Sequence, residues 1–174
     1  DLLHGLKRDL VALNLLGNFL AVFMALLIFR NVRNAIVAIV PALLGTFASL
    51  SVFVWLDYPV TVVSNVVPVL ILVLALADSV HLTMHFKNDA TDDPLRVRLG
   101  RTIREVSPAC ALTTITTAIA FGAISISDND QLVEFSILGT TAIVLSHIVI
   151  MLAFVILAPF ADNTPRGEKK GADW

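Results

Sequence analysis

Asp78 and His147 are the residues whose type and position most clearly suggest chemistry, because each interrupts a long apolar run. Asp78 lies about 13 Å along a helix from Lys87, and His147 about 18 Å from the start of its own run. Both depths fall near the middle of a bilayer core of about 30 Å. An ionisable side chain is costly there and usually marks an ion or proton path, so the pair suggests a proton relay. The alternatives are a structural carboxyl bonded to a hydroxyl and a histidine bonded to a backbone carbonyl.

Other polar residues could extend this relay. Thr114 and Thr117 lie in the inner half of another apolar run, where their hydroxyls could complete a hydrogen-bonded path, although such threonines more often bond back to their own helix. His81 and His85 follow Asp78 at i+3 and i+7, roughly on one helix face, and could form a polar exit lane or simply anchor the helix at the interface. No third ligand accompanies the two histidines, so we expect no metal.

Asn65 and Pro68 stand at the start of the run that carries Asp78, and together they predict a bent or partly unwound helix start. The sequence has no GxxxxGK[ST], GxSxG or HExxH motif. We therefore expect a protein that is not an enzyme and that needs no cofactor.

The amino-acid composition indicates that the apolar runs of this chain lie in a lipid bilayer. Of the 174 residues, 57% are hydrophobic and 15% are charged, whereas soluble domains have about 25% charged residues. The net charge of −2 gives no basic field for a nucleic-acid partner, and the single cysteine, Cys110, excludes an internal disulfide.

Five runs are long enough to cross a bilayer as helices of about 20 residues, which predicts an all-α integral membrane protein. Residues 1–9 would form an extracytoplasmic entry segment, residues 10–160 the transmembrane bundle and residues 161–174 a cytoplasmic tail. The predicted spans are residues 11–29, 35–56, 60–86, 109–127 and 135–157.

Charge in the connecting segments predicts the orientation. Ten of the twelve Lys and Arg residues fall on one side of the five spans, and the other side carries only Lys7 and Arg8. The positive-inside rule makes the basic side cytoplasmic, with the N-terminus outside and the C-terminus inside. Because the chain starts with Asp1 and has no targeting segment, we expect it to be part of a longer protein.

Residues 88–107 form the longest connection. Leu95, Leu99, Ile103 and Val106 are spaced as one helical face between arginines, which predicts a short amphipathic helix on the cytoplasmic membrane surface. Two pairs of small residues predict close approaches between helices, namely Gly45 with Ser49 and Ala118 with Gly122.

Several stretches resemble a known family. Residues 65–68 (NVVP) with 77–82 (ADSVHL) are similar to the fourth transmembrane helix of RND-superfamily permeases, most of all the bacterial MMPL-like predicted exporters, which are related to sterol-sensing-domain and Patched-type proteins. Residues 107–121 are similar to the fifth helix and residues 157–160 (LAPF) to the end of the sixth. Residues 8–10 (RDL) resemble the entry into helix two.

The resemblance implies an RND-type half-bundle that contains helices two to six and lacks helix one and the extracytoplasmic domain. It also implies that protons passing midplane carboxylates drive the export of hydrophobic or amphiphilic compounds, such as lipids, sterol-like molecules or drugs. Asp78 matches the proton carrier of helix four. Ser79 stands where drug-efflux members have a second carboxylate, and we include it in the predicted relay.

The implied partners are the lipid bilayer, protons as coupling ion, the exported compound and the missing helix one, outer domain and second half, from the same chain or another. The implied location is the bacterial inner membrane. Two alternatives remain: a sterol- or lipid-sensing membrane module without transport activity, and a truncated remnant.

Overall fold

The structure is a computed structural model, and it describes residues 15–17, 19–20, 22–29, 31–55, 66–89, 91 and 93–161. Its four longest helices, all apolar enough to cross a membrane, are α2 (Val32–Trp55), α3 (Val67–Asn88), α4 (Leu95–Ile124) and α5 (Asp130–Ala161). A shorter apolar helix at Leu15–Phe29 precedes them. The described part of the chain is therefore an all-helical bundle, as predicted, and no strand occurs in it.

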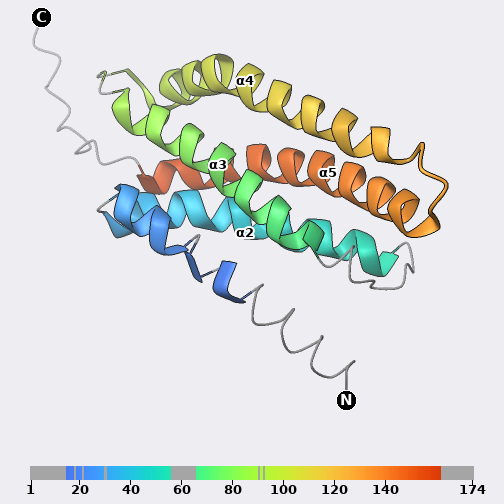
Figure 1. Cartoon of the computed structure of the whole chain (residues 1–174). Coiled ribbons are helices and arrows are strands. Elements are labelled where there is room, and N and C mark those ends of the chain that lie inside the picture. Colours follow the sequence, from blue (N-terminus) through green and yellow to red (C-terminus); the bar gives the residue numbers. More distant parts are fainter. Residues whose placement is uncertain are drawn as a thin grey trace, which may run out of the picture.

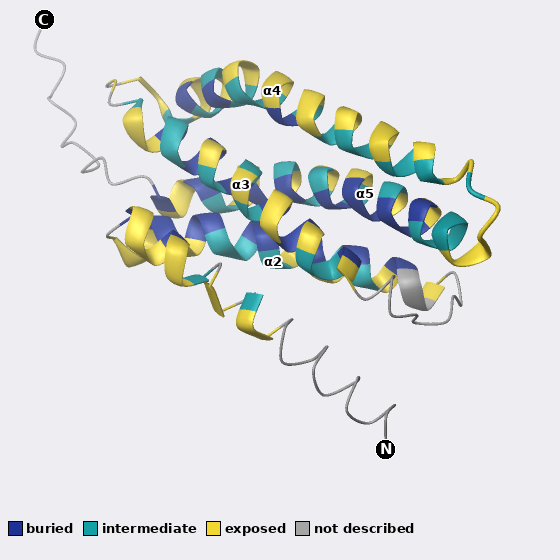
Figure 2. Ribbon diagram, viewed as in Figure 1, coloured by how far each residue is buried: buried dark blue, intermediate teal, exposed yellow. Residues whose placement is uncertain are grey.

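The four long helices alternate in direction along the bundle (Figure 1). Among these four helices, α5 contacts α2, α3 and α4, and α4 makes its main contacts with α5 and α3. In Figure 2 the buried positions concentrate where α2, α3 and α5 face one another, whereas much of α4 is exposed. In the second half of α4 the exposed side chains include the large apolar residues Leu112, Ile115 and Ile119, as expected for a surface that meets lipid tails.

α2 and α5 approach closely at one of the two predicted pairs of small residues. A Cβ atom added at Gly45 would lie 2.7 Å from Ser146 Oγ and 3.2 Å from the Ser146 carbonyl oxygen. One turn later, the Ser49 hydroxyl lies 2.9 Å from the Ala142 carbonyl oxygen of α5 and 2.8 Å from the Gly45 carbonyl oxygen. The small pair thus permits the contact, as predicted, and Ser49 adds a hydrogen bond across it.

We expect Ser49→Ala to lower the free energy of unfolding by about 0.6 kcal/mol, the average for interhelical hydrogen bonds in membranes. Ser51→Ala is the matched control, because the Ser51 hydroxyl bonds only carbonyl oxygens of α2 itself, at Phe47 and Ala48. Unfolding of both variants in mixed micelles measures the difference. Equal effects of the two substitutions would mean that the bond to α5 contributes nothing.

The structure places Pro68 at the start of α3. Pro68 lies in the first turn of α3, which begins at Val67, so its missing N–H removes no intrahelical hydrogen bond. Asn65, the other predicted bend residue, lies outside the described residues. Pro41 and Pro108, in contrast, do lie inside α2 and α4.

The connection before the fourth span also differs from the prediction. Residues 95–124 form one continuous helix, not a surface helix followed by a separate span. Pro108 disfavours helix at Ser107 but does not exclude it, and the helix continues through both residues. Leu95, Leu99 and Val106 pack against the core of the bundle, so this apolar face is directed at protein rather than at the membrane surface.

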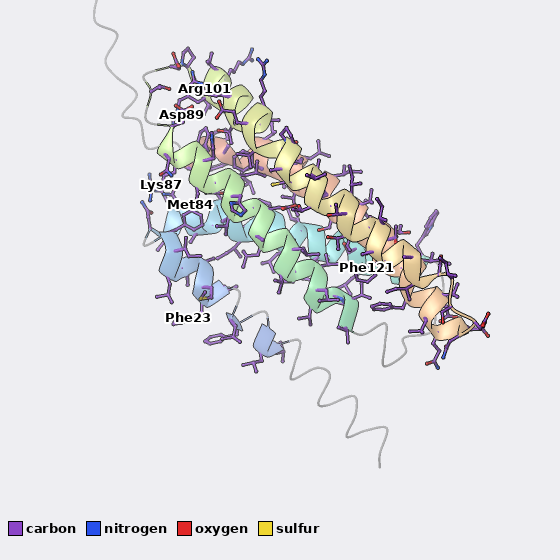
Figure 3. All side chains as sticks on the ribbon, turned by 45° about the horizontal axis from the view of Figure 1, so that its top comes forward. Phe23, Met84, Lys87, Asp89, Arg101 and Phe121 are labelled. Atoms are coloured by element: carbon purple, nitrogen blue, oxygen red, sulfur yellow. The ribbon has the colours of Figure 1, made fainter. Side chains whose placement is uncertain are left out.

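The corner between α3 and α4 is fixed by two arginines, of which Arg98 is buried rather than directed toward lipid headgroups as predicted. Its guanidinium donates to the carbonyl oxygens of Asp89 (3.0 Å) and Phe86 (3.3 Å) at the end of α3, where carbonyl groups lack helical partners. It also lies 4.8 Å from the centre of the Phe86 ring. Arg101 bridges Asp89 at 2.8 Å and Asp93 at 2.6 Å (Figure 3 labels Asp89 and Arg101).

This corner predicts a pH dependence of stability. The hydrogen bond from the Thr91 hydroxyl, and then the charge of Arg101, hold the pKa of Asp89 below its ordinary value of 3.8. A lowered folded-state pKa stabilises the fold above pH 3.8, and this contribution disappears as pH falls through the folded-state pKa.

We therefore expect the Tm of the native sequence in detergent to fall more steeply below about pH 4 than that of Asp89→Asn. The difference should be no more than a few degrees, because the Arg101 side of this ion pair is 35% exposed and partly exposed ion pairs contribute little. Thermal unfolding between pH 2.5 and pH 6 measures it, and identical acid limbs for the two proteins would contradict the expectation.

Candidate functional site

Asp78 and His147 meet in the centre of the bundle. Asp78 is the twelfth of the 22 residues of α3, and His147 the eighteenth of the 32 residues of α5. His147 Nδ1 lies 3.3 Å from Asp78 Oδ2, and the two side chains are only 16% and 15% exposed. The structure therefore brings together the two residues that were predicted to lie at one depth, because α3 and α5 turn these side chains toward each other.

The pair can hold a proton on either partner without changing its total charge. Asp78 as an acid with a neutral His147, and an aspartate with an imidazolium, carry the same net charge of zero. The 3.3 Å separation is within hydrogen-bond reach but longer than the 2.7–2.9 Å of a strong charge-assisted bond. Binding one further proton would leave a net positive charge in the middle of the bundle, which is costly in an apolar surrounding.

A small cavity adjoins the pair. Its volume is about 20 Å³, enough for roughly one water molecule. Thr113, Thr114 and Thr117 of α4 and Ser146 of α5 line it together with Asp78 and His147. Polar side chains of three helices therefore converge on one place, and both predicted threonines are among them.

The hydroxyl groups of Thr114 and Thr117 already donate hydrogen bonds within α4. Thr114 donates to the Cys110 carbonyl oxygen at 2.9 Å, and Thr117 to the Thr113 carbonyl oxygen at 2.7 Å. This is the bonding within the helix that threonines commonly make. In this state their oxygens can accept a hydrogen bond from water in the cavity, but the threonines cannot pass a proton on without rotating.

Ser79 is not part of this group. Successive residues of a helix are turned by about 100°, so Ser79 faces away from the direction of Asp78 and does not line the cavity. Its side chain is fully buried, and its hydroxyl has no hydrogen-bond partner among the described residues. The structure thus does not bring Ser79 together with the other predicted relay residues.

A second, larger cavity lies between α3 and α4 on the side of Asp78 that faces the α3–α4 corner. Its volume is about 300 Å³, and its polar lining consists of Asp78 and His81 of α3 and Glu105, Cys110 and Thr113 of α4. We call it the α3–α4 cavity. It begins at the midplane carboxyl and extends along the predicted exit lane.

His85, the other predicted lane residue, pairs with Glu105, since His85 Nε2 lies 3.0 Å from Glu105 Oε2. Glu105 was not predicted as a site residue, because the sequence favours a membrane-surface helix over residues 88–107. A signal was present: Glu105 is the one acidic residue within residues 95–107, which carry four arginines, and such an exception suggests a specific partner. Among the described residues, no three histidine, cysteine or acidic side chains come together as metal ligands.

The two ends of the bundle differ in charge. Arg33, Lys87 and Arg101 lie at the end where α3 finishes and α4 begins, and Asp128, Asp130 and Glu134 lie at the opposite end, between α4 and α5 (Figure 1). The His85–Glu105 pair belongs to the basic end. The α3–α4 cavity therefore extends from the middle of the bundle toward that end.

Comparison with known proteins gives one family. The sterol-sensing domain family, described as "Sterol-sensing domain of SREBP cleavage-activation", matches residues 28–161. No curated protein and no solved structure matches the chain. The matched region contains all of α2, α3, α4 and α5, and with them Asp78, His147 and both cavities. This match supports the predicted relationship to sterol-sensing and Patched-type proteins and indicates a sterol- or lipid-related membrane module. The chain belongs to the sterol-sensing domain family.

Proposed function

We propose that this chain is the proton-carrying membrane part of an RND-type exporter of hydrophobic or amphiphilic compounds, of the MMPL-like branch. The observation that carries the proposal is the Asp78–His147 pair in the centre of the bundle, 3.3 Å apart and mostly buried. Ionisable side chains at this depth cost free energy, and where they occur they usually mark an ion or proton path. Reversible proton binding is the chemistry that these two groups share.

Polar surroundings support proton movement rather than a closed structural pair. The cavity beside the pair has room for about one water, and the α3–α4 cavity connects Asp78 with His81 and Glu105. A carboxyl group that only held α3 against α5 would need neither of these two cavities. In the proposed mechanism a proton binds the pair from the acidic end of the bundle and leaves through the α3–α4 cavity toward the basic end.

The orientation follows from the same asymmetry of charge. The basic end would be cytoplasmic by the positive-inside rule, which places the N-terminus outside, the C-terminus inside and the proton flow inward. In this proposal the location is a bacterial inner membrane. Helix one, an outer domain and a second half-bundle would complete the transporter and supply the path of the exported compound.

The second candidate is a sterol- or lipid-sensing module without transport activity, and membership of the sterol-sensing domain family favours it equally. The two proposals differ in what protons do. A sensing module binds its lipid saturably and moves no protons, whereas an exporter couples the two movements.

The test uses the full-length protein in proteoliposomes that contain a pH-sensitive dye and a fluorescent amphiphile. An imposed pH gradient should drive the amphiphile against its own gradient, and nigericin, which collapses the pH gradient, should stop this movement. Saturable sterol binding without proton flux, under conditions in which the protein is correctly inserted, would support the sensing module and overturn the exporter.

A further inference from the structure

Glu105 occupies a distinctive place at the end of the α3–α4 cavity. Its side chain is 53% exposed, whereas that of Asp78 at the other end of the same cavity is 15% exposed. The two carboxyl groups therefore line one cavity, with one group in the protected centre and the other in contact with the surroundings. Between them lies His81, and the cavity volume of about 300 Å³ leaves room for several waters.

His85 ties Glu105 to α3. The Nε2–Oε2 distance of 3.0 Å is that of a hydrogen bond, and the other ring nitrogen, Nδ1, is buried without a partner among the described residues. His85 lies seven residues after Asp78, or about 10 Å along α3. The imidazole therefore holds Glu105 at a fixed distance from the midplane pair and has an ionisable proton of its own.

The arginine one turn away from Glu105 does not compete with His85 for the Glu105 carboxylate. Arg101, one turn earlier on α4, is already engaged by Asp89 and Asp93 at 2.8 and 2.6 Å. α5 has no charged or titratable side chain after His147 in its described length, and α2 has Arg33 near its start. Besides the pair itself, the charged or titratable groups on these two helices are Asp78, His81 and Lys87 on α3, and Arg96, Arg98, Arg101, Arg104 and Cys110 on α4.

We propose that Glu105 is the proton-release group of this domain, which takes the proton that leaves Asp78 and passes it to the cytoplasmic side. The proton moves from the Asp78 carboxyl through water in the α3–α4 cavity to the Glu105 carboxylate, so that one carboxyl is ionised as the other becomes neutral. The neutral Glu105 loses its ion pair with His85, and the pair forms again once the proton has passed to bulk water. This inference rests on the proposed function and names the next residue on the proton path.

The test compares Glu105→Gln, Glu105→Asp and the native sequence in the full-length protein, in proteoliposomes in which the pH on each side is set separately. Glu105→Gln should slow proton flux by roughly tenfold or more, as expected when a proton-transfer group is removed. Its remaining flux should also lose the native dependence on cytoplasmic-side pH. Glu105→Asp should recover most of both. Glu134→Gln is the control for the pH dependence: it neutralises a glutamate at the opposite end of the bundle, and its flux should keep the native dependence on cytoplasmic-side pH.

Two further variants, His85→Ala and Asp78→Asn, distinguish proton release by Glu105 from a purely structural role of this side chain. If Glu105 served only to hold α4 against α3, His85→Ala and Glu105→Gln would lower thermal stability alike and leave the pH profile of flux unchanged, which would overturn the inference. If Asp78→Asn abolishes flux while Glu105→Gln keeps the native rate and pH profile, the proposed function stands and this inference fails. If Asp78→Asn itself retains proton-coupled transport, both fail.

Discussion

We expect the replacement of Asp78 by asparagine to abolish the proposed proton-coupled export while the protein still inserts and folds. The amide has nearly the shape of the carboxyl and can still bond His147 across 3.3 Å, but it cannot bind and release a proton. We expect transport to fall at least about 100-fold, since proton transfer by a positioned group contributes roughly 10²–10⁴-fold. Amphiphile transport by the full-length protein in proteoliposomes, driven by an imposed pH gradient, measures the loss.

Asp128→Asn is the matched control for this experiment. It makes the same chemical change in the connection between α4 and α5, at a position that lines neither cavity, and should leave transport unchanged. Membrane insertion and thermal unfolding of both variants must match the native protein. Export that persists in Asp78→Asn at the native rate would refute the assignment of Asp78 as the proton carrier.

The centre of the site was predictable because depth in a membrane helix follows from counting residues. A rise of 1.5 Å per residue places Asp78 and His147 at one level, and the bundle then has few ways to keep two polar groups from lipid except by turning them toward each other. The same argument from depth predicted that Thr114 and Thr117 belong to the site. The rotation of each helix was not available from depth, so Ser79, one residue from Asp78, was included although it faces elsewhere.

The part of the site at the basic end of the bundle was not predictable in the same way. The segment before Pro108 has the spacing of an amphipathic helix, and both a membrane surface and the side of a bundle accept such a face. Only the packing of Leu95 and Leu99 against the core decides between them, and this packing is what brings Glu105 to His85. A tertiary contact thus created a functional candidate from a residue that looked like part of a solvated surface.

Close helix contacts were predictable only where small residues repeat. The Gly45–Ser49 pair has the spacing of two small residues on one helix face, and its contact with α5 follows that pattern. Gly139 has no such partner four residues away on α5, because Phe135 and Ile143 occupy those positions. The residue that Gly139 approaches closely is Phe121 of the neighbouring helix α4, and no pattern within α5 reveals this contact.

Gly139→Ala is the second substitution with a large expected effect. A Cβ atom at Gly139 would overlap the ring of Phe121 on α4, with Cε1 at 2.5 Å and Cγ at 3.1 Å. Phe121 cannot easily move away, because its ring packs against Phe135 with centres 5.2 Å apart. Its carbonyl oxygen also accepts a hydrogen bond of 2.6 Å from the Ser136 hydroxyl of α5. Overpacking of this kind costs about 1–3 kcal/mol, and unfolding of the full-length protein in mixed micelles measures it.

Gly100→Ala controls for the glycine itself. Gly100 also lies inside a helix, α4, but nothing lies within 4 Å of an added Cβ there. Alanine at that position should stabilise the helix by up to about 1 kcal/mol through its higher helix propensity. The two identical substitutions should therefore act in opposite directions. Phe121→Ala should relieve the overlap, so the double variant with Gly139→Ala should be more stable than the sum of the two single effects predicts. Additive effects would mean that the α4–α5 interface yields elsewhere and that Phe121 does not set its spacing.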